Sequence, residues 1–161
     1  MLKREEEHVF AHAVETVVAS WTDEAFLAAM MERQGSRDVV VTVDRPGPGK
    51  IHVAIIRQVP VDAPAMIRAV IGSWLSLTQR DVWTQAADGS WSAVRDAKPK
   101  GLSAEGHCML ALTPRGDGST HCAATVSVQS RAPMVAAMVE TLMLEDSTRM
   151  LRQEFAAIDA A

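Results

Sequence analysis

The stretch from Pro133 to Ala161 constrains the fold most, because it predicts one long helix that needs covering on two sides. Pro133 suits a first helical turn, where its missing N–H costs nothing, and neither Gly nor another Pro follows it. Apolar residues recur at steps of three and four along two stripes, which lie roughly 130° apart around the helix. The first stripe contains Val135, Val139, Leu142, Asp146 and Met150, and the second contains Leu144, Leu151, Phe155 and Ile158. We expect the rest of the chain to wrap this helix; the alternative is that the second stripe forms a dimer surface.

Most of the remaining chain predicts strands joined by tight turns. Gly and Pro clusters mark the turns, and β-branched or alternating apolar segments lie between them. The predicted order is a strand at 8–14, short helices at 16–21 and 23–33, strands at 37–44 and 50–59, a helical turn or two within 61–71, and strands at 74–86, 90–96, 102–112 and 120–131. The sequence therefore predicts an α+β protein in which a first strand and two helices precede six strands and the long helix.

Alternation along these strands predicts which residues share a face of the sheet. In the first hairpin we expect Val43 opposite Ile51, Val41 opposite Val53 and Val39 opposite Ile55; in the last, Leu112 opposite Cys122, Leu110 opposite Ala124 and Cys108 opposite Val126. Reading Asp88-Gly89 as a two-residue turn pairs Trp83 with Val94 in the middle hairpin. In that register one face of the sheet, which we predict to be concave, contains Leu75, Leu77, Gln79, Asp81, Trp83, Val94 and Asp96.

Length and charge limit the classes of function that the chain can have. A chain of 161 residues is long enough for one hydrophobic core, so we expect a single domain over residues 1–161. The net charge is −4 and no basic cluster is present, which argues against a nucleic-acid partner. Five of the first seven residues are charged, and no uncharged run reaches the ~20 residues of a membrane span, so we expect a cytoplasmic protein without an integral membrane segment.

The two cysteines, Cys108 and Cys122, are expected to be free. Their predicted offset of about four residues along the last hairpin separates them by ~14 Å, beyond the ~7 Å Cα limit of a disulfide. Neither has a second Cys or a His at metal-ligand spacing, so we expect no metal site and no cofactor. The five histidines form no Ser-His-Asp or Cys-His arrangement with these residues.

The order of elements resembles the helix-grip fold of the START-like superfamily, which includes the birch-pollen allergens, lipid-transfer proteins and polyketide cyclases. The resemblance extends over nearly the whole chain. Local segments also resemble an uncharacterised bacterial branch of that superfamily: Thr22–Leu27, Val61–Pro64, Asp81–Trp83 and Thr113–Gly118. None of these segments is a catalytic signature, and a fold does not fix a function.

What the resemblance implies is a curved seven-stranded antiparallel sheet that grips the C-terminal helix, with an apolar cavity between them. A hydrophobic small molecule such as a lipid, sterol or polyketide would occupy that cavity. The residues expected to line it follow from the predicted pairing and helix faces: Leu75, Leu77, Gln79, Trp83, Val94, Cys108, Leu110, Val126, Met66, Met138, Leu142 and Asp146. Flexible methionine side chains in the helices suit an irregular apolar ligand, although Met at helical spacing also builds ordinary cores.

Three acids, Asp81, Asp96 and Asp146, are candidate catalytic residues. A carboxylate in an apolar cavity has a raised pKa and can serve as a general acid or base, which would make the protein a cyclase, isomerase or dehydratase. The alternative is that the acids pair with Arg80, Arg95 or Arg149. The sequence thus leaves three functions open: ligand binding, catalysis in the same cavity, and a protein-interaction module. It also leaves open whether the protein is a monomer or a homodimer.

Overall fold

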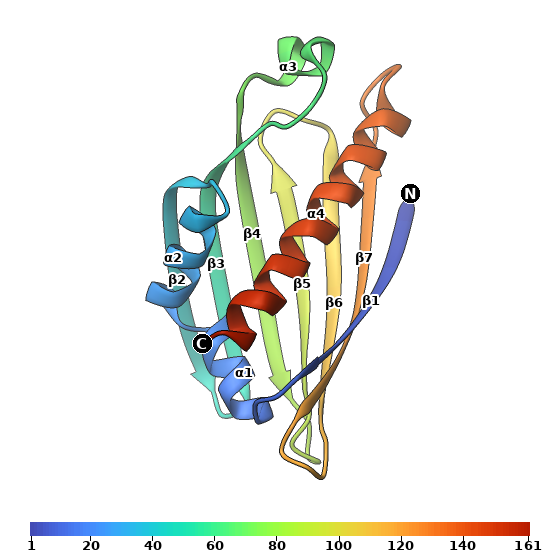
Figure 1. Ribbon diagram of the computed structural model, residues 1–161. Helices are drawn as coiled ribbons and strands as arrows, with labels where there is room; N and C mark the ends of the chain where they lie inside the picture. Colours follow the sequence, from blue (N-terminus) through green and yellow to red (C-terminus); the bar gives the residue numbers. More distant parts are fainter.

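The computed structural model describes all 161 residues and contains seven strands and four helices (Figure 1). The strands are β1 (Leu2–Phe10), β2 (Arg37–Gly47), β3 (Lys50–Pro60), β4 (Trp74–Gln85), β5 (Trp91–Pro99), β6 (Ala104–Pro114) and β7 (Thr120–Ser130). The helices are α1 (Val14–Trp21), α2 (Glu24–Arg33), α3 (Ala65–Ile71) and α4 (Ala136–Asp159). The element order matches the predicted one.

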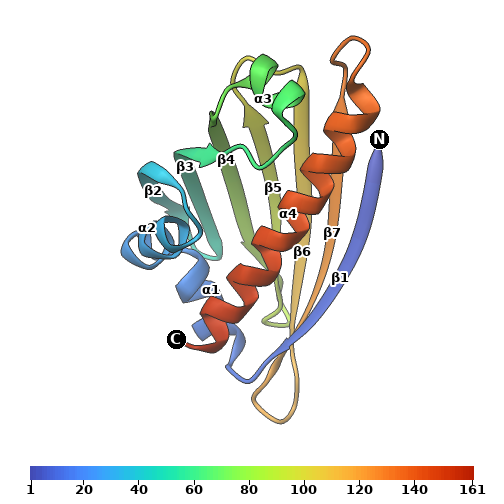
Figure 2. The same ribbon diagram turned by 45° about the horizontal axis from the view of Figure 1, so that its top comes forward.

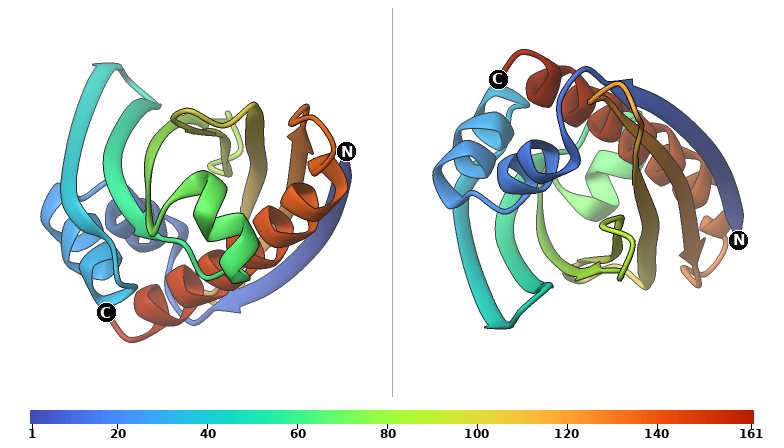
Figure 3. Two further views of the ribbon diagram at one scale, coloured as in Figure 1. Left: turned by 90° about the horizontal axis from the view of Figure 1, so that it is seen from above. Right: turned by 90° about the horizontal axis from the view of Figure 1, so that it is seen from below.

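The strands form one antiparallel sheet in the order β1-β7-β6-β5-β4-β3-β2. The sheet curves around α4, which crosses its concave side diagonally and packs mainly on β7 and β1 (Figure 3). Helices α1 and α2 lie near the C-terminal end of α4, whereas α3 lies at the opposite end of the molecule (Figures 1 and 2). This is the helix-grip fold, and the prediction of fold class is confirmed.

Several predicted boundaries differ from the structure, and two of the differences have clear causes. The first strand occupies Leu2–Phe10 rather than 8–14, because the charged N-terminal residues pair with β7 along its whole length, from Leu2 opposite Val128 to Phe10 opposite Thr120. The last helix begins at Ala136 rather than Pro133, because Met134 has a left-handed backbone (φ 66°) that no α-helix contains. None of the four helices has the length and apolar character that crossing a bilayer requires.

The predicted registers of the first and last hairpins keep the correct faces. In the β6–β7 hairpin, Leu112 pairs with Cys122 and Leu110 with Ala124, as predicted. In the β2–β3 hairpin, Val43 pairs with Val53 rather than Ile51, a slip of two residues that follows an irregularity between Asp44 and Gly47. A slip of two leaves every side chain on its predicted face, because side chains in a strand alternate with period two.

The predicted register of the β4–β5 hairpin was wrong by one residue. Its loop has three residues: the Gly89 N–H donates to the Ala86 carbonyl, and Gly89 takes a left-handed φ of 87°. Trp83 therefore pairs with Ala93, not Val94. A shift of one moves a strand's side chains to the other face, so Val94 is exposed on the convex side and Arg95 points inward.

The core lies between the sheet and the helices at the α1 end. Trp21, Phe10 and Phe155 meet edge to face there, and Trp21 also packs against Trp83. Trp83 is fully buried, as predicted. Both cysteines are free and buried, with Cys108 opposite Val126 and Cys122 opposite Leu112. Aromatic burial of this kind contributes much of the apolar packing at this end of the molecule.

Candidate functional site

A buried ion network lies between the middle of the sheet and α4. Arg95 of β5 donates from Nε and Nη2 to the two oxygens of Asp81 on β4, at 2.9 and 3.0 Å. It also donates from Nη1 and Nη2 to the two oxygens of Glu154 on α4, both at 3.0 Å. All three residues are buried. Arg95 thus joins the sheet to the long helix through two bidentate pairs, the strongest geometry for such contacts.

Two neutral groups complete this network. Trp21 Nε1 donates to Glu154 Oε1 at 3.1 Å, and Gln79 Nε2 donates to Asp81 Oδ1 at 3.1 Å. Burial alone would lower the pKa of Arg95, but the charges and hydrogen bonds of Asp81 and Glu154 more than offset it and raise that pKa well above the ordinary arginine value. Arg95 therefore stays charged, and both carboxylates have their acceptor oxygens occupied.

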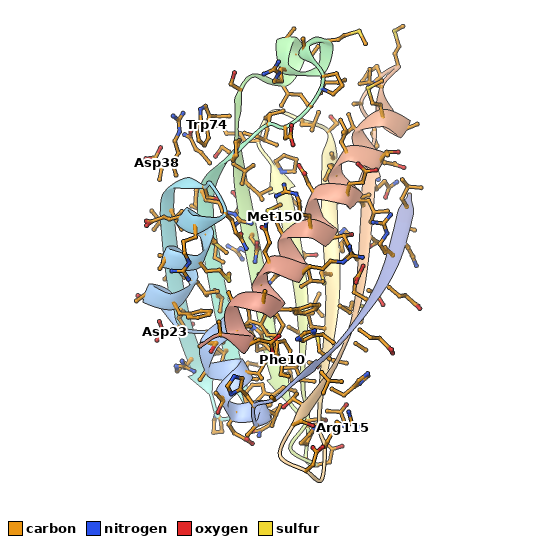
Figure 4. All side chains as sticks on the ribbon, in the orientation of Figure 1. Phe10, Asp23, Asp38, Trp74, Arg115 and Met150 are labelled. Carbon is orange, nitrogen blue, oxygen red and sulfur yellow. The ribbon has the colours of Figure 1, made fainter.

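A second buried guanidinium, that of Arg57, lies beside this network without sharing its hydrogen bonds. Arg57 continues the inward series Ile51, Val53 and Ile55 along β3 and is 5% exposed. Its Nη2 donates weakly to Met150 Sδ at 3.8 Å, while Nε and Nη1 have no acceptor. Figure 4 places Met150 on the side of α4 that faces the sheet. Arg57 is a charged, buried donor with unused N–H groups.

Three cavities follow one another along α4. The innermost, about 60 Å³, is bounded by Arg57, Gln79 and Arg95 from the sheet and by Met150 and Glu154 from α4. The next, about 70 Å³, is mostly apolar and lies between Leu75 on β4, Leu142 on α4 and the start of α3. The outermost, about 260 Å³, shares Ile67, Ile71, Leu102 and Val139 with the second and opens beneath α3. The inner end contains the charged side chains, and the lining under α3 is mostly apolar.

Most of the predicted ligand-binding residues lie along this series. The inner cavity is lined by Leu77, Gln79, Cys108 and Val126, the middle one by Leu75, Leu142 and Asp146, and the outer one by Met66. Trp83 and Leu110 lie in the packed core beyond the cavities. Met138 is 41% exposed and lines none of the three, and Val94 lies on the opposite face of the sheet.

The three candidate catalytic acids do not form a site. Asp81 faces inward as predicted, but it pairs with Arg95. Asp96 was predicted on the concave face; the one-residue shift places it on the convex side, where it bonds to His107 Nδ1. Asp146 borders the middle cavity, is partly exposed and accepts from Arg149 Nη2 at 3.0 Å. No group of three His, Cys, Asp or Glu side chains is arranged to hold a metal ion.

A family model covers nearly all of this chain. The model is described as "Protein of unknown function (DUF2505)" and matches residues 5–160. The chain belongs to this DUF2505 family. A comparison with curated proteins finds no match. The family assignment thus identifies the proteins to which the chain is related, but it gives no activity.

Solved structures similar to this DUF2505 member share its fold at low sequence identity. The STAR-related lipid transfer protein of Xanthomonas axonopodis (fragment 25–204) has a TM-score of 0.62 at 14% identity, over 97% of this chain and 85% of that one. The Zhui aromatase/cyclase of Streptomyces sp. R1128 has a TM-score of 0.61 at 14% identity, over 99% and 93%. A conserved protein of Geobacillus kaustophilus has 0.60 at 14%, also over 99% and 93%. The DUF2505 chain therefore has the START-like fold, as its sequence resemblance implied.

Sequence reasoning missed two charged residues of this DUF2505 site, Arg57 and Glu154, and named Arg95 only as one possible partner of the acids. Two signals were present. Arg57 has the same strand parity as Ile51, Val53 and Ile55, and Glu154 lies three and four residues from Leu151 and Ile158 on one helix face. Periodicity predicts that both side chains face the interior, and only their charge favoured an exposed position. Arg95 had no such signal, because its face depended on the length of one loop.

Proposed function

We propose that this protein binds an apolar small molecule in the cavities between the sheet and α4. The observation that supports the proposal is the series of three cavities along one side of α4, of which the outer two are mostly apolar and the outermost is the largest. Ligand pockets combine apolar walls with a few polar groups in this way. The shared fold with a lipid transfer protein and an aromatase/cyclase agrees with this function.

The packing of α3 supports entry of the ligand at that end. Helix α3 makes few contacts with other elements, while α4 packs extensively on β7 and β1. Met66 and Val70 of α3 are exposed, although Ile67 points inward. A short segment with so little buried surface opens locally at low free-energy cost. We expect the ligand to enter beneath α3 and to extend along α4 toward the middle of the sheet.

No observation favours acid–base catalysis in this cavity. Asp81 and Glu154 are already occupied by Arg95, and Asp96 lies on the other side of the sheet. A general base must reach a proton of the substrate with a free oxygen. Binding without chemistry is therefore the function that these side chains support best.

The proposal is tested with N-phenyl-1-naphthylamine, a neutral probe that fluoresces in apolar sites. Leu142→Trp fills the middle cavity from α4, and Leu75→Trp fills it from the opposite wall on β4. We expect either variant to bind the probe at least about tenfold more weakly. Val94→Trp is the matched control, because Val94 lies on the convex face and its enlargement leaves the cavities unchanged. Circular dichroism confirms folding of each variant. Absence of probe binding to the unmodified protein, or equal affinity in all variants, would contradict the proposal.

A further inference from the structure

Arg57 is placed where a bound ligand would reach it. Its side chain borders the inner cavity together with Leu77 and Met150, at the end of the series farthest from α3. Leu77 lies two residues after Leu75 on the same face of β4, and Met150 lies one turn after Asp146 on α4. Leu75 and Asp146 border the middle cavity, so the two cavities are neighbours. A ligand that extends inward from the apolar cavities meets Arg57 at its tip.

The donors of Arg57 have no partner in the protein. Nε carries one N–H and Nη1 two, and neither atom has an acceptor although both are fully buried. The only contact of Nη2 is the thioether of Met150 at 3.8 Å. Buried polar groups without partners are rare in folded proteins, because each loses its hydrogen bonds to water. The nearby carboxylates do not fill this role, since both are directed to Arg95.

Burial of the unpaired charge is unfavourable by itself. Loss of solvation lowers the pKa of Arg57, and the negative charge of Glu154 opposes this only in part. Arg95, Asp81 and Glu154 together carry one net negative charge, which Arg57 balances from a distance. A carboxylate on the Nε/Nη2 edge or on the Nη1/Nη2 edge, in place of the weak contact of Nη2 with Met150, would supply what this network does not.

We propose that Arg57 binds the carboxylate of an elongated apolar acid whose chain lies in the cavities toward α3. This inference rests on the proposed function and names the class of ligand. A guanidinium matches a carboxylate because its N–H groups form a planar fork and the carboxylate offers two oxygens, whereas a neutral carbonyl offers one. A cavity of about 60 Å³ has room for such a head group but not for a large polar one. A carboxylate adds one negative charge beside Asp81 and Glu154, whereas a phosphate dianion would add two and be repelled more strongly.

The test compares decanoic acid with methyl decanoate as competitors of N-phenyl-1-naphthylamine at pH 7.5. The two have the same chain, and only the acid is charged. We expect the unmodified protein to bind the acid about tenfold more tightly than the ester, since charge-assisted hydrogen bonds are about twice as strong as neutral ones. Arg57→Met, which keeps the length of the side chain, should remove this preference by weakening binding of the acid about tenfold more than binding of the ester. Arg57→Gln should do the same if the methionine variant folds poorly.

The control is Arg80→Met, on the same sheet but facing outward, which should keep the preference for the acid. Equal binding of acid and ester by the unmodified protein would overturn the role of Arg57. So would an equal loss of both ligands in Arg57→Met, because that pattern indicates a structural role. Both of these outcomes leave the proposed function standing. If the probe itself does not bind the unmodified protein, the proposed function fails first.

Discussion

The two ends of the interior are stabilised by different forces. Around Trp21 and Arg95 the space is filled by aromatic rings and by a buried ion network that joins β4, β5 and α4. Around Ile67 and Val139 the side chains are apolar, two cavities remain, and α3 covers them with few contacts (Figure 2). The first end is built to hold α4 in place. The second end contains cavities that a ligand can occupy. Because of this difference, we place ligand entry under α3 and the head group of the ligand at Arg57.

Removal of the central cation is expected to have the largest effect. Arg95→Met leaves Asp81 and Glu154 buried without a counter-charge, so we expect a loss of about 3–5 kcal/mol in the free energy of unfolding. Urea denaturation at pH 7 measures it, with Arg80→Met as the exposed control. The deficit should shrink as the pH is lowered toward about 4, because protonation removes the uncompensated charges. A loss of less than about 1 kcal/mol would mean that this network does not anchor α4.

Local opening should differ between the two ends. We expect the amides of α3 to exchange with solvent through openings of about 1–2 kcal/mol, while the amides from Leu144 to Ile158 in α4 exchange only with global unfolding. Native-state hydrogen exchange measures both in one experiment. Equal protection of α3 and α4 would remove the basis for ligand entry beneath α3.

Replacement of Arg57 is expected to change the free energy of unfolding less than replacement of Arg95, and to raise it. Arg57→Met removes a buried charge that has no direct partner and replaces it with an apolar chain of similar length, so we expect a gain of about 1 kcal/mol. The same denaturation assay measures it. A loss of 2 kcal/mol or more would show instead that Arg57 is an essential counter-charge for Asp81 and Glu154.

The two buried cysteines should be unreactive toward thiol reagents in the folded protein at neutral pH. Burial raises the pKa of Cys108 to about 11 and that of Cys122 to about 12, so both are neutral thiols in the folded protein at pH 8. A disulfide reagent such as Ellman's should therefore react with them only after unfolding. Because the unfolded thiols ionise first, stability should fall as the pH rises above about 9. Rapid reaction of both thiols in the folded protein would contradict this burial.

The fold was predictable from the sequence because alternation and helical period are strong signals over long elements. The two hairpins that contain Asp-Gly-Ser show where this reasoning stops. In both, the Asp side chain accepts from the Ser N–H at 3.0 Å, and the Gly has a left-handed φ, 87° at Gly89 and 85° at Gly118. Both loops have the same three-residue form. The apolar pairs Leu112–Cys122 and Leu110–Ala124 gave the correct register in one, while reading Asp88-Gly89 as a two-residue turn gave the wrong register in the other.

The buried ion network was not predictable by the same means. Charged side chains at inward positions conflict with the apolar pattern unless their partners are known, and those partners lie far apart in the chain. Arg95 meets Glu154 across 59 residues, and Arg57 meets Met150 across 93. Only the assembled sheet and helix bring these groups together. The charged groups Arg57 and Glu154 therefore required the structure, while the apolar sheet residues beside them, Leu77, Cys108 and Val126, followed from the sequence.

The most direct test of the account is the direction of a bound acid, read from nuclear Overhauser effects between decanoate and methionine methyl groups. Met150 lies beside Arg57, and Met66 borders the cavity under α3. We predict contacts from the methylene next to the carboxylate to Met150 and from the terminal methyl group to Met66. Contacts only to Met109, which is exposed on the convex face, or a reversed orientation with the carboxylate at Met66, would contradict the account.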